Sequence, residues 1–204
     1  MGFCAWKPWI ILKYLESMVD GEILLYHDTN CSRHPYYGQS QKYMKGYLQF
    51  LLKLSGEDLS IAWDDPESNK AIHYVKQEVI EDICSGSFEF TSEYPMMCSN
   101  RIIIRKSEKS IRIIKEWETY CKKRKYMTPD FPPQLPGFKN HKHDQALLTA
   151  IIAKNIKKGN LKKNFPGYYF SGKIFNFDST RTYKWGYEKY FETKAEDTSL
   201  NYII

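Results

Sequence analysis

Near its N-terminus the chain reads Ile23-Leu24-Leu25-Tyr26-His27-Asp28, an apolar run that ends in a carboxylate. A run this apolar is typical of a strand that is buried on both faces of a sheet. Open α/β sheets place ligand chemistry at the carboxyl ends of their strands, so Asp28 stands where a functional carboxylate is expected. Aspartate is also common in turns for purely local reasons. Position alone leaves both interpretations open.

The rest of the chain alternates between extended and helical patterns. Strands are expected at 22–27, 59–63 and 98–105, and residues 126–138, with four prolines and one glycine, are expected to form a loop. Apolar residues recur at helical spacing over five segments: 8–18, 43–54, 71–83, 108–121 after a Ser107 cap, and 144–154. Strands that alternate with helices predict an α/β layer architecture.

Length and composition limit the class of protein. A chain of 204 residues fits one domain, and its formal net charge of +6 favours an anionic ligand. The five cysteines have no zinc-ligand or disulfide spacing, so reduced thiols are expected. We expect a cytoplasmic protein, because no apolar stretch reaches the roughly 18 residues of a membrane span and Met1–Cys4 does not read as a signal peptide.

A second polar cluster, His141-Lys142-His143-Asp144-Gln145, opens the last helical segment. Asp144 and Gln145 could bond sugar hydroxyls, and His141 or His143 could ligate a metal or contact a phosphate. The alternative is an ordinary helix cap with solvated neighbours. The functional interpretation requires that folding bring this cluster and Asp28 into one site.

Two shorter motifs add to this picture. Asp28-Thr29-Asn30 could hold a divalent ion against a diphosphate, since Mg²⁺ and Mn²⁺ prefer oxygen ligands. In Trp6-Lys7-Pro8, Lys7 could meet a phosphate with help from the free amides of the helix that follows. The alternative for this motif is an exposed lysine beside a packed tryptophan.

Several of these segments together resemble one family. Gly2-Phe3-Cys4-Ala5-Trp6-Lys7-Pro8, the segment Asp20–Asp28 and Glu116-Trp117 are similar to motifs of a group of GT-A-type glycosyltransferases found in bacteria and large DNA viruses. Phe138, His141, His143, Asp144 and Gln145 match that group's "Phe…His-x-His-Asp-Gln" segment most closely. The resemblance covers roughly residues 2–155, in the same order along the chain.

The resemblance implies a GT-A-like, Rossmann-type mixed central sheet flanked by helices. It implies transfer of a sugar from a nucleotide-sugar donor, such as a UDP-sugar, to a hydroxyl of a glycan or protein acceptor. A divalent Mn²⁺ or Mg²⁺ would neutralise the leaving diphosphate. By this resemblance Asp28 would bind the metal and the donor diphosphate, Lys7 would lie near the nucleotide, and Asp144 and Gln145 would face the donor sugar or acceptor and be catalytic. With the residues considered above, the predicted metal ligands are Asp28, Asn30 and His141, and the predicted donor-binding residues are Lys7, Trp6, Asp28 and His143.

Two departures from the family pattern open alternatives. Asn30 stands where a second acid is expected, and relatives carry a strand and helix before the Trp-Lys-Pro motif that residues 1–204 lack, so we expect a single, N-terminally shortened domain. A non-catalytic nucleotide- or sugar-binding remnant of the fold is therefore the second hypothesis. A basic nucleic-acid-binding protein is the third, ranked last because the lysines gather at predicted helix ends and not along one stripe.

Overall fold

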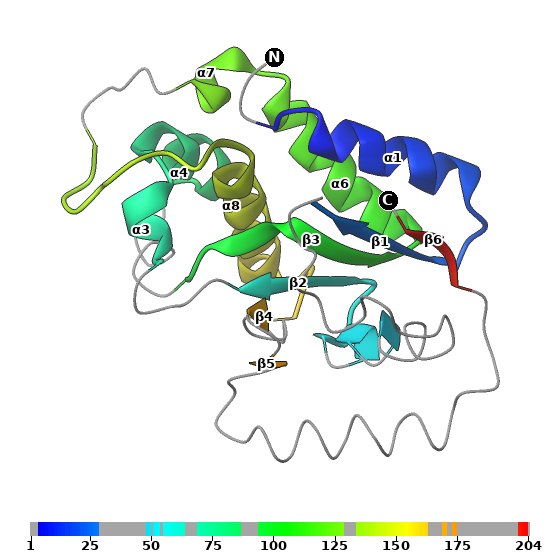
Figure 1. Ribbon diagram of the computed structural model, residues 1–204. Coiled ribbons are helices and arrows are strands. Elements are labelled where there is room, and N and C mark those ends of the chain that lie inside the picture. Colours follow the sequence, from blue (N-terminus) through cyan, green and yellow to red (C-terminus); the bar gives the residue numbers. More distant parts are fainter. Residues whose placement is uncertain are drawn as a thin grey trace.

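The computed structural model describes residues 4–28, 48–49, 51–53, 55–63, 69–86, 94–128, 134–162, 169–170, 173–174 and 200–203. Within these residues the chain is a mixture of helices and strands around a small sheet (Figure 1). The α/β prediction is confirmed at this level.

The sheet has the strand order β2-β3-β1-β6 (Figure 1). Strand β3 (Met97–Arg105) pairs antiparallel with both β1 (Ile23–His27) and β2 (Leu59–Trp63). The short strand β6 (Leu200–Ile203) pairs parallel with β1 and makes the sheet mixed. A separate two-stranded pair joins β4 (Tyr169–Phe170) and β5 (Lys173–Ile174). The three strands expected from the sequence within residues 22–105 are confirmed.

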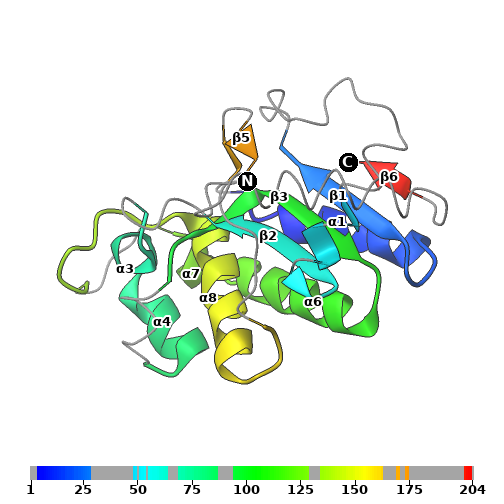
Figure 2. The same cartoon turned by 90° about the horizontal axis from the view of Figure 1, so that it is seen from below.

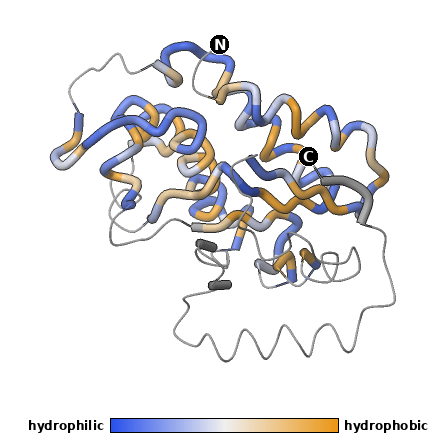
Figure 3. Tube along the Cα trace, viewed as in Figure 1, coloured by the Kyte–Doolittle hydropathy of each residue, from blue (hydrophilic) through white to orange (hydrophobic). Residues whose placement is uncertain are grey.

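Strand β1 is buried on both faces, as its unbroken apolar pattern predicts. Leu24 and Tyr26, which lie opposite Ile104 and Ile102 of β3, belong to the main hydrophobic core. Leu25 points to the other face of the sheet because side chains alternate along a strand, and it too is fully buried. Figure 3 shows apolar residues concentrated along these strands.

Three long helices supply the main core on one side of the sheet. Helix α6 (Glu108–Cys121) lies beside both α1 (Lys7–Ser17) and α8 (His143–Lys157), while α1 contacts β1 and α8 contacts β3 (Figure 2). Helix α6 starts at Ser107, whose side chain accepts a bond from the amide of Ser110 in a capping box. The predicted helices 8–18, 108–121 and 144–154 are therefore confirmed, with ends displaced by a few residues.

The single helix predicted over 71–83 is wrong. The structure has two helices, α3 (Ala71–Tyr74) and α4 (Gln77–Cys84), separated by extended backbone at Val75 and Lys76. Lys76 leaves the helical path because its amide donates to the His141 ring and its Nζ donates to carbonyls near residue 128. These partners are more than 45 residues away, so local periodicity cannot predict the break.

Two other expectations, for residues 126–138 and 43–54, are met only in part. The loop expected over 126–138 opens with a short helix, α7 (Arg124–Met127), and residues 129–133 lie outside the described part of the chain. The helix expected over 43–54 is helical at 48–49 and 51–53, and its other residues are outside the description. Among the described residues, no helix has the length and apolar character needed to cross a membrane.

Candidate functional site

The candidate site is built around the buried ammonium of Lys7. The Nζ atom of Lys7 lies 3.0 Å from Oδ2 of Asp28 and 3.4 Å from Oδ2 of Asp144. Lys7 opens α1, Asp28 follows β1, and Asp144 lies in the first turn of α8. Three segments that are far apart in the sequence therefore meet at one nitrogen. The expectation that Asp28 and the 141–145 cluster come together is confirmed for Asp144.

Lys7 is buried and Trp6 is partly exposed, which is the reverse of the exposed lysine and packed tryptophan that the sequence allowed as the alternative. Lys7 is 4% exposed and Trp6 is 46% exposed. Burial alone would lower the pKa of Lys7, but the nearby carboxylates of Asp144 and Asp28 outweigh it and raise that pKa. The ammonium is therefore held charged inside the protein by two acids.

Each carboxylate also accepts a hydrogen bond from a hydroxyl group. The hydroxyl of Tyr26 donates to Oδ1 of Asp28 at 2.7 Å, and that of Ser99 donates to Oδ2 of Asp144 at 2.9 Å. Burial and this bond to Asp28 raise the pKa of Tyr26, so the phenol stays protonated. Sequence reasoning missed both donors. Tyr26 could have been found, because it lies two residues before Asp28 on the same face of β1.

Asp144 is the more enclosed of the two acids. Its side chain is 11% exposed against 26% for Asp28, and its backbone carbonyl accepts the indole N–H of Trp117 at 3.0 Å. Burial raises the pKa of Asp144 although Lys7 and Ser99 act to lower it. When Lys7, Asp28 and Asp144 are all ionised, the cluster carries one net negative charge. Asp28 is the acid of this cluster that faces solvent.

His141 is a buried residue that bonds to the protein backbone. It is 3% exposed, and both of its ring nitrogens bond to the backbone. Nδ1 accepts from the amide of Lys76 at 3.4 Å, so Nε2 carries the proton and donates to the carbonyl of Tyr126 at 2.8 Å. Burial lowers the pKa of His141 to about 4. Backbone groups engage both nitrogens in this structure, and the metal role of His141 stays a prediction.

The other histidine of the motif also contacts the segment around α7. Nδ1 of His143 lies 2.9 Å from the carbonyl of Met127, and Lys76 donates to the carbonyls of Lys125 and Thr128. Together with His141, these side chains satisfy four successive carbonyls, 125 to 128, at the end of α7. His143 holds a left-handed backbone (φ +36°), an unusual conformation for a residue other than glycine. This bonding positions the start of α8, and thus Asp144, against the rest of the core.

The structure says less about the roles of the remaining predicted site residues. Gln145 is half-buried in the first turn of α8, next to Asp144. Trp6 lies just before α1 and next to Lys7, with its side chain half exposed. Asn30 lies outside the described residues. Binding of the donor by Trp6 or His143 stays a prediction.

Among the described residues of this cluster, the carboxylates are the groups that could hold a divalent metal. In the described part of the chain, no three His, Cys, Asp or Glu side chains converge as a ready ligand set. Asp28 nevertheless suits Mg²⁺ or Mn²⁺, because it is partly exposed and such ions often take one or two carboxylates together with phosphate oxygens and water. Asp144 is less suited, since its Oδ2 is already shared by Lys7 and Ser99.

Comparison with known proteins does not assign the chain to a family. No family model matches the chain, and neither a curated protein nor a solved structure is significantly similar to it.

Proposed function

We propose that this protein is a GT-A-like glycosyltransferase that moves a sugar from a nucleotide-sugar donor to an acceptor hydroxyl. The observation that carries the proposal is the meeting of Lys7, Asp28 and Asp144. Each of these three residues belongs to a different motif that resembles the family. The functional interpretation required that two of the motifs, the one that ends in Asp28 and the 141–145 cluster, share a site. If the motifs resembled the family by chance, there would be no reason for their residues to lie together in the folded protein.

In the proposed site Asp28 holds the metal that faces the donor diphosphate. Its carboxylate is partly exposed and therefore accessible, and Tyr26 and Lys7 fix its orientation. A bound Mn²⁺ or Mg²⁺ would supply Lewis-acid stabilisation of the leaving diphosphate. The ammonium of Lys7 pairs with the carboxylates of both Asp28 and Asp144. Its main effect on the donor is therefore to keep Asp28 in place.

Asp144 and Gln145 are assigned to the sugar and acceptor side of the site. Burial raises the pKa of Asp144, which makes this carboxylate a better proton acceptor for an attacking hydroxyl than an exposed aspartate. The hydrogen bonds from Ser99 and Lys7 hold it in one orientation. Gln145 stands beside it, where its amide could bond a sugar hydroxyl.

The test is turnover with a panel of nucleotide sugars in the presence of Mn²⁺, followed as donor hydrolysis or as transfer. Asp28→Asn should reduce turnover by about a hundredfold or more, because it removes charge at the diphosphate. Asp82→Asn is the matched control, since Asp82 lies on α4 and bonds Lys125 and Tyr126 at the surface. A folded parent protein with neither turnover nor nucleotide binding would refute the proposal.

The second candidate is a nucleotide- or sugar-binding protein without catalysis. It is favoured by the full engagement of Lys7 with two acids and of His141 with backbone groups, which leaves Asp28 as the one solvent-facing carboxylate of this cluster. Nucleotide binding without turnover, retained in Asp28→Ala, would establish this candidate in place of the first.

A further inference from the structure

The exposed large apolar side chains in the described part of the chain all lie on α1 or at its two ends. They are Trp6 at 46%, Trp9 at 51%, Tyr14 at 37% and Val19 at 69% exposure. Single exposed apolar residues are normal on any protein surface, but a concentration on one helix marks an interaction site. We call these four residues the α1 patch.

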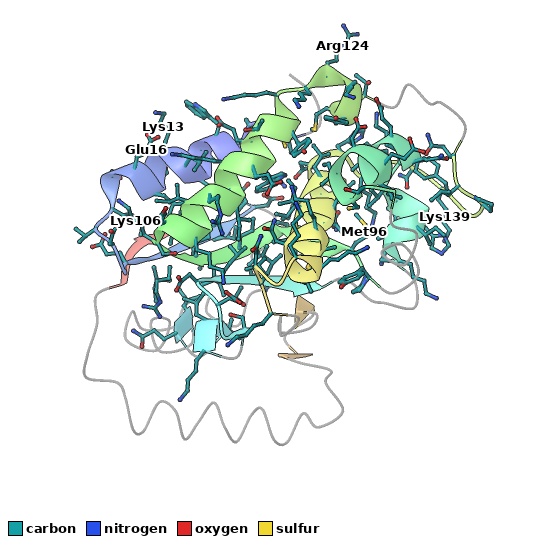
Figure 4. All side chains as sticks on the ribbon, turned by 180° about the vertical axis from the view of Figure 1, so that it is seen from behind. Lys13, Glu16, Met96, Lys106, Arg124 and Lys139 are labelled. Carbon is teal, nitrogen blue, oxygen red and sulfur yellow. The ribbon has the colours of Figure 1, made fainter. Side chains whose placement is uncertain are left out.

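The α1 patch lies beside a cationic surface. Helices α1 and α6 run side by side, and Lys106 joins the start of α6 to the end of α1 through a 2.6 Å bond to the carbonyl of Met18 (Figure 4). Apart from Lys125, which pairs with Asp82 and Glu78 of α4, the exposed positions of α1, α6 and α7 and of the turn after α1 carry six cations and three acids. The cations are Lys13, Arg112, Lys115, Lys122, Lys123 and Arg124, and the acids are Glu16, Asp20 and Glu108.

We propose that the α1 patch and this cationic surface dock the protein onto an anionic lipid membrane. Tryptophan and tyrosine have rings that suit the boundary between headgroups and acyl chains, where the neighbouring lysines and arginines reach lipid phosphates. Each basic residue close to an anionic leaflet adds to the binding energy, and the excess of cations matches that charge. The attachment is peripheral, and vesicle binding does not require the proposed transferase activity.

Other occupants fit this surface less well. A symmetric dimer over the same face would bring the cations of two copies together. The four apolar side chains are also too few for the roughly 800 Å² that each partner buries in a stable interface. A nucleic acid would use the cations and stack on the rings, but it would leave the aliphatic Val19 without a partner.

The test is sedimentation of the full chain with vesicles of phosphatidylcholine alone and of phosphatidylcholine with phosphatidylserine. We expect binding to the anionic vesicles that weakens with added salt, and little binding to the neutral ones. Trp6→Ala/Trp9→Ala should bind at least about tenfold more weakly, because the apolar contact is lost. Arg112→Gln/Lys115→Gln should bind about 25-fold more weakly, at about fivefold for each cation.

Lys157→Gln/Lys158→Gln is the charge-matched control. It removes two exposed cations at the end of α8, away from α1 (Figure 1), and should bind vesicles almost as tightly as the parent. A melting curve for each variant checks that it is folded. Three results would overturn the proposal: no binding to anionic vesicles at low salt, equal binding by the double tryptophan variant, or binding to DNA with none to vesicles.

Discussion

Replacing Lys7 with methionine tests the electrostatic basis of the candidate site. Methionine keeps most of the volume and the unbranched shape of the side chain, so the packing around α1 should change little. The substitution removes the ammonium and leaves the carboxylates of Asp28 and Asp144 facing each other. We expect a large loss of folding free energy, because a buried charge that has lost its partner is costly.

The magnitude follows from the two distances. The Oδ2 atoms of Asp28 and Asp144 lie 3.0 Å and 3.4 Å from the same nitrogen, so the two oxygens are at most 6.4 Å apart. At that limit two unit charges repel by about 2.6 kcal/mol for an effective dielectric of about 20. Breaking a buried pair typically costs about 3–5 kcal/mol. Water can reach the 26% exposed side chain of Asp28, so we expect the low end, about 3 kcal/mol.

The loss should also depend on pH. Without the ammonium, Asp144 can relieve the repulsion by taking up a proton, so its pKa in the folded protein rises further above the value in the unfolded chain. A carboxyl group with a raised pKa contributes stability that is present at low pH and lost as the pH rises through that pKa. The difference in unfolding free energy between the parent and Lys7→Met should therefore be smaller at pH 5 than at pH 7.

Urea unfolding followed by far-UV circular dichroism measures both quantities. Lys13→Met is the matched control, since Lys13 pairs with Glu16 at the same 3.0 Å on the same helix but with side chains 56% and 58% exposed. That control should cost less than about 0.5 kcal/mol. A loss below about 1 kcal/mol for Lys7→Met at pH 7, or the same loss at both pH values, would refute this account of Lys7.

Two further predictions concern the supporting structure. The pKa of His141 is about 4 in the folded protein against 6.5 as the ordinary value, so the unfolded chain takes up the proton first and stability should fall by about 2 kcal/mol from pH 7 to pH 5. Urea unfolding of His141→Gln should show a clearly shallower decline, with the lowered pKa of His143 still acting in the same direction, and an unchanged decline would contradict the assignment. Ser107→Ala should cost about 1 kcal/mol in the same assay because it removes the cap of α6, whereas Ser107→Asp, which can also cap, should cost much less.

Much of the secondary structure could be predicted because its causes are local. The apolar run of β1, the Ser107 cap of α6 and the helical spacing of α1 and α8 each lie within a few neighbouring residues. The break at Val75 and Lys76 could not be predicted in this way. It depends on carbonyls and a ring that only the folded chain brings to Lys76.

The sequence by itself determined which residue types are available for chemistry, and the positions of Lys7, Asp28 and Asp144 in its motifs made them candidates. Tertiary structure alone decided that Lys7 is buried while Trp6 faces solvent, because a helical pattern does not tell which side of the first turn the sheet will cover. It also decided that His141 packs as a neutral core residue, and that Tyr26 and Ser99 support the two acids. Lys7 and Asp144 form an ion pair although they are 137 positions apart, so this pairing is chosen by packing and not by spacing.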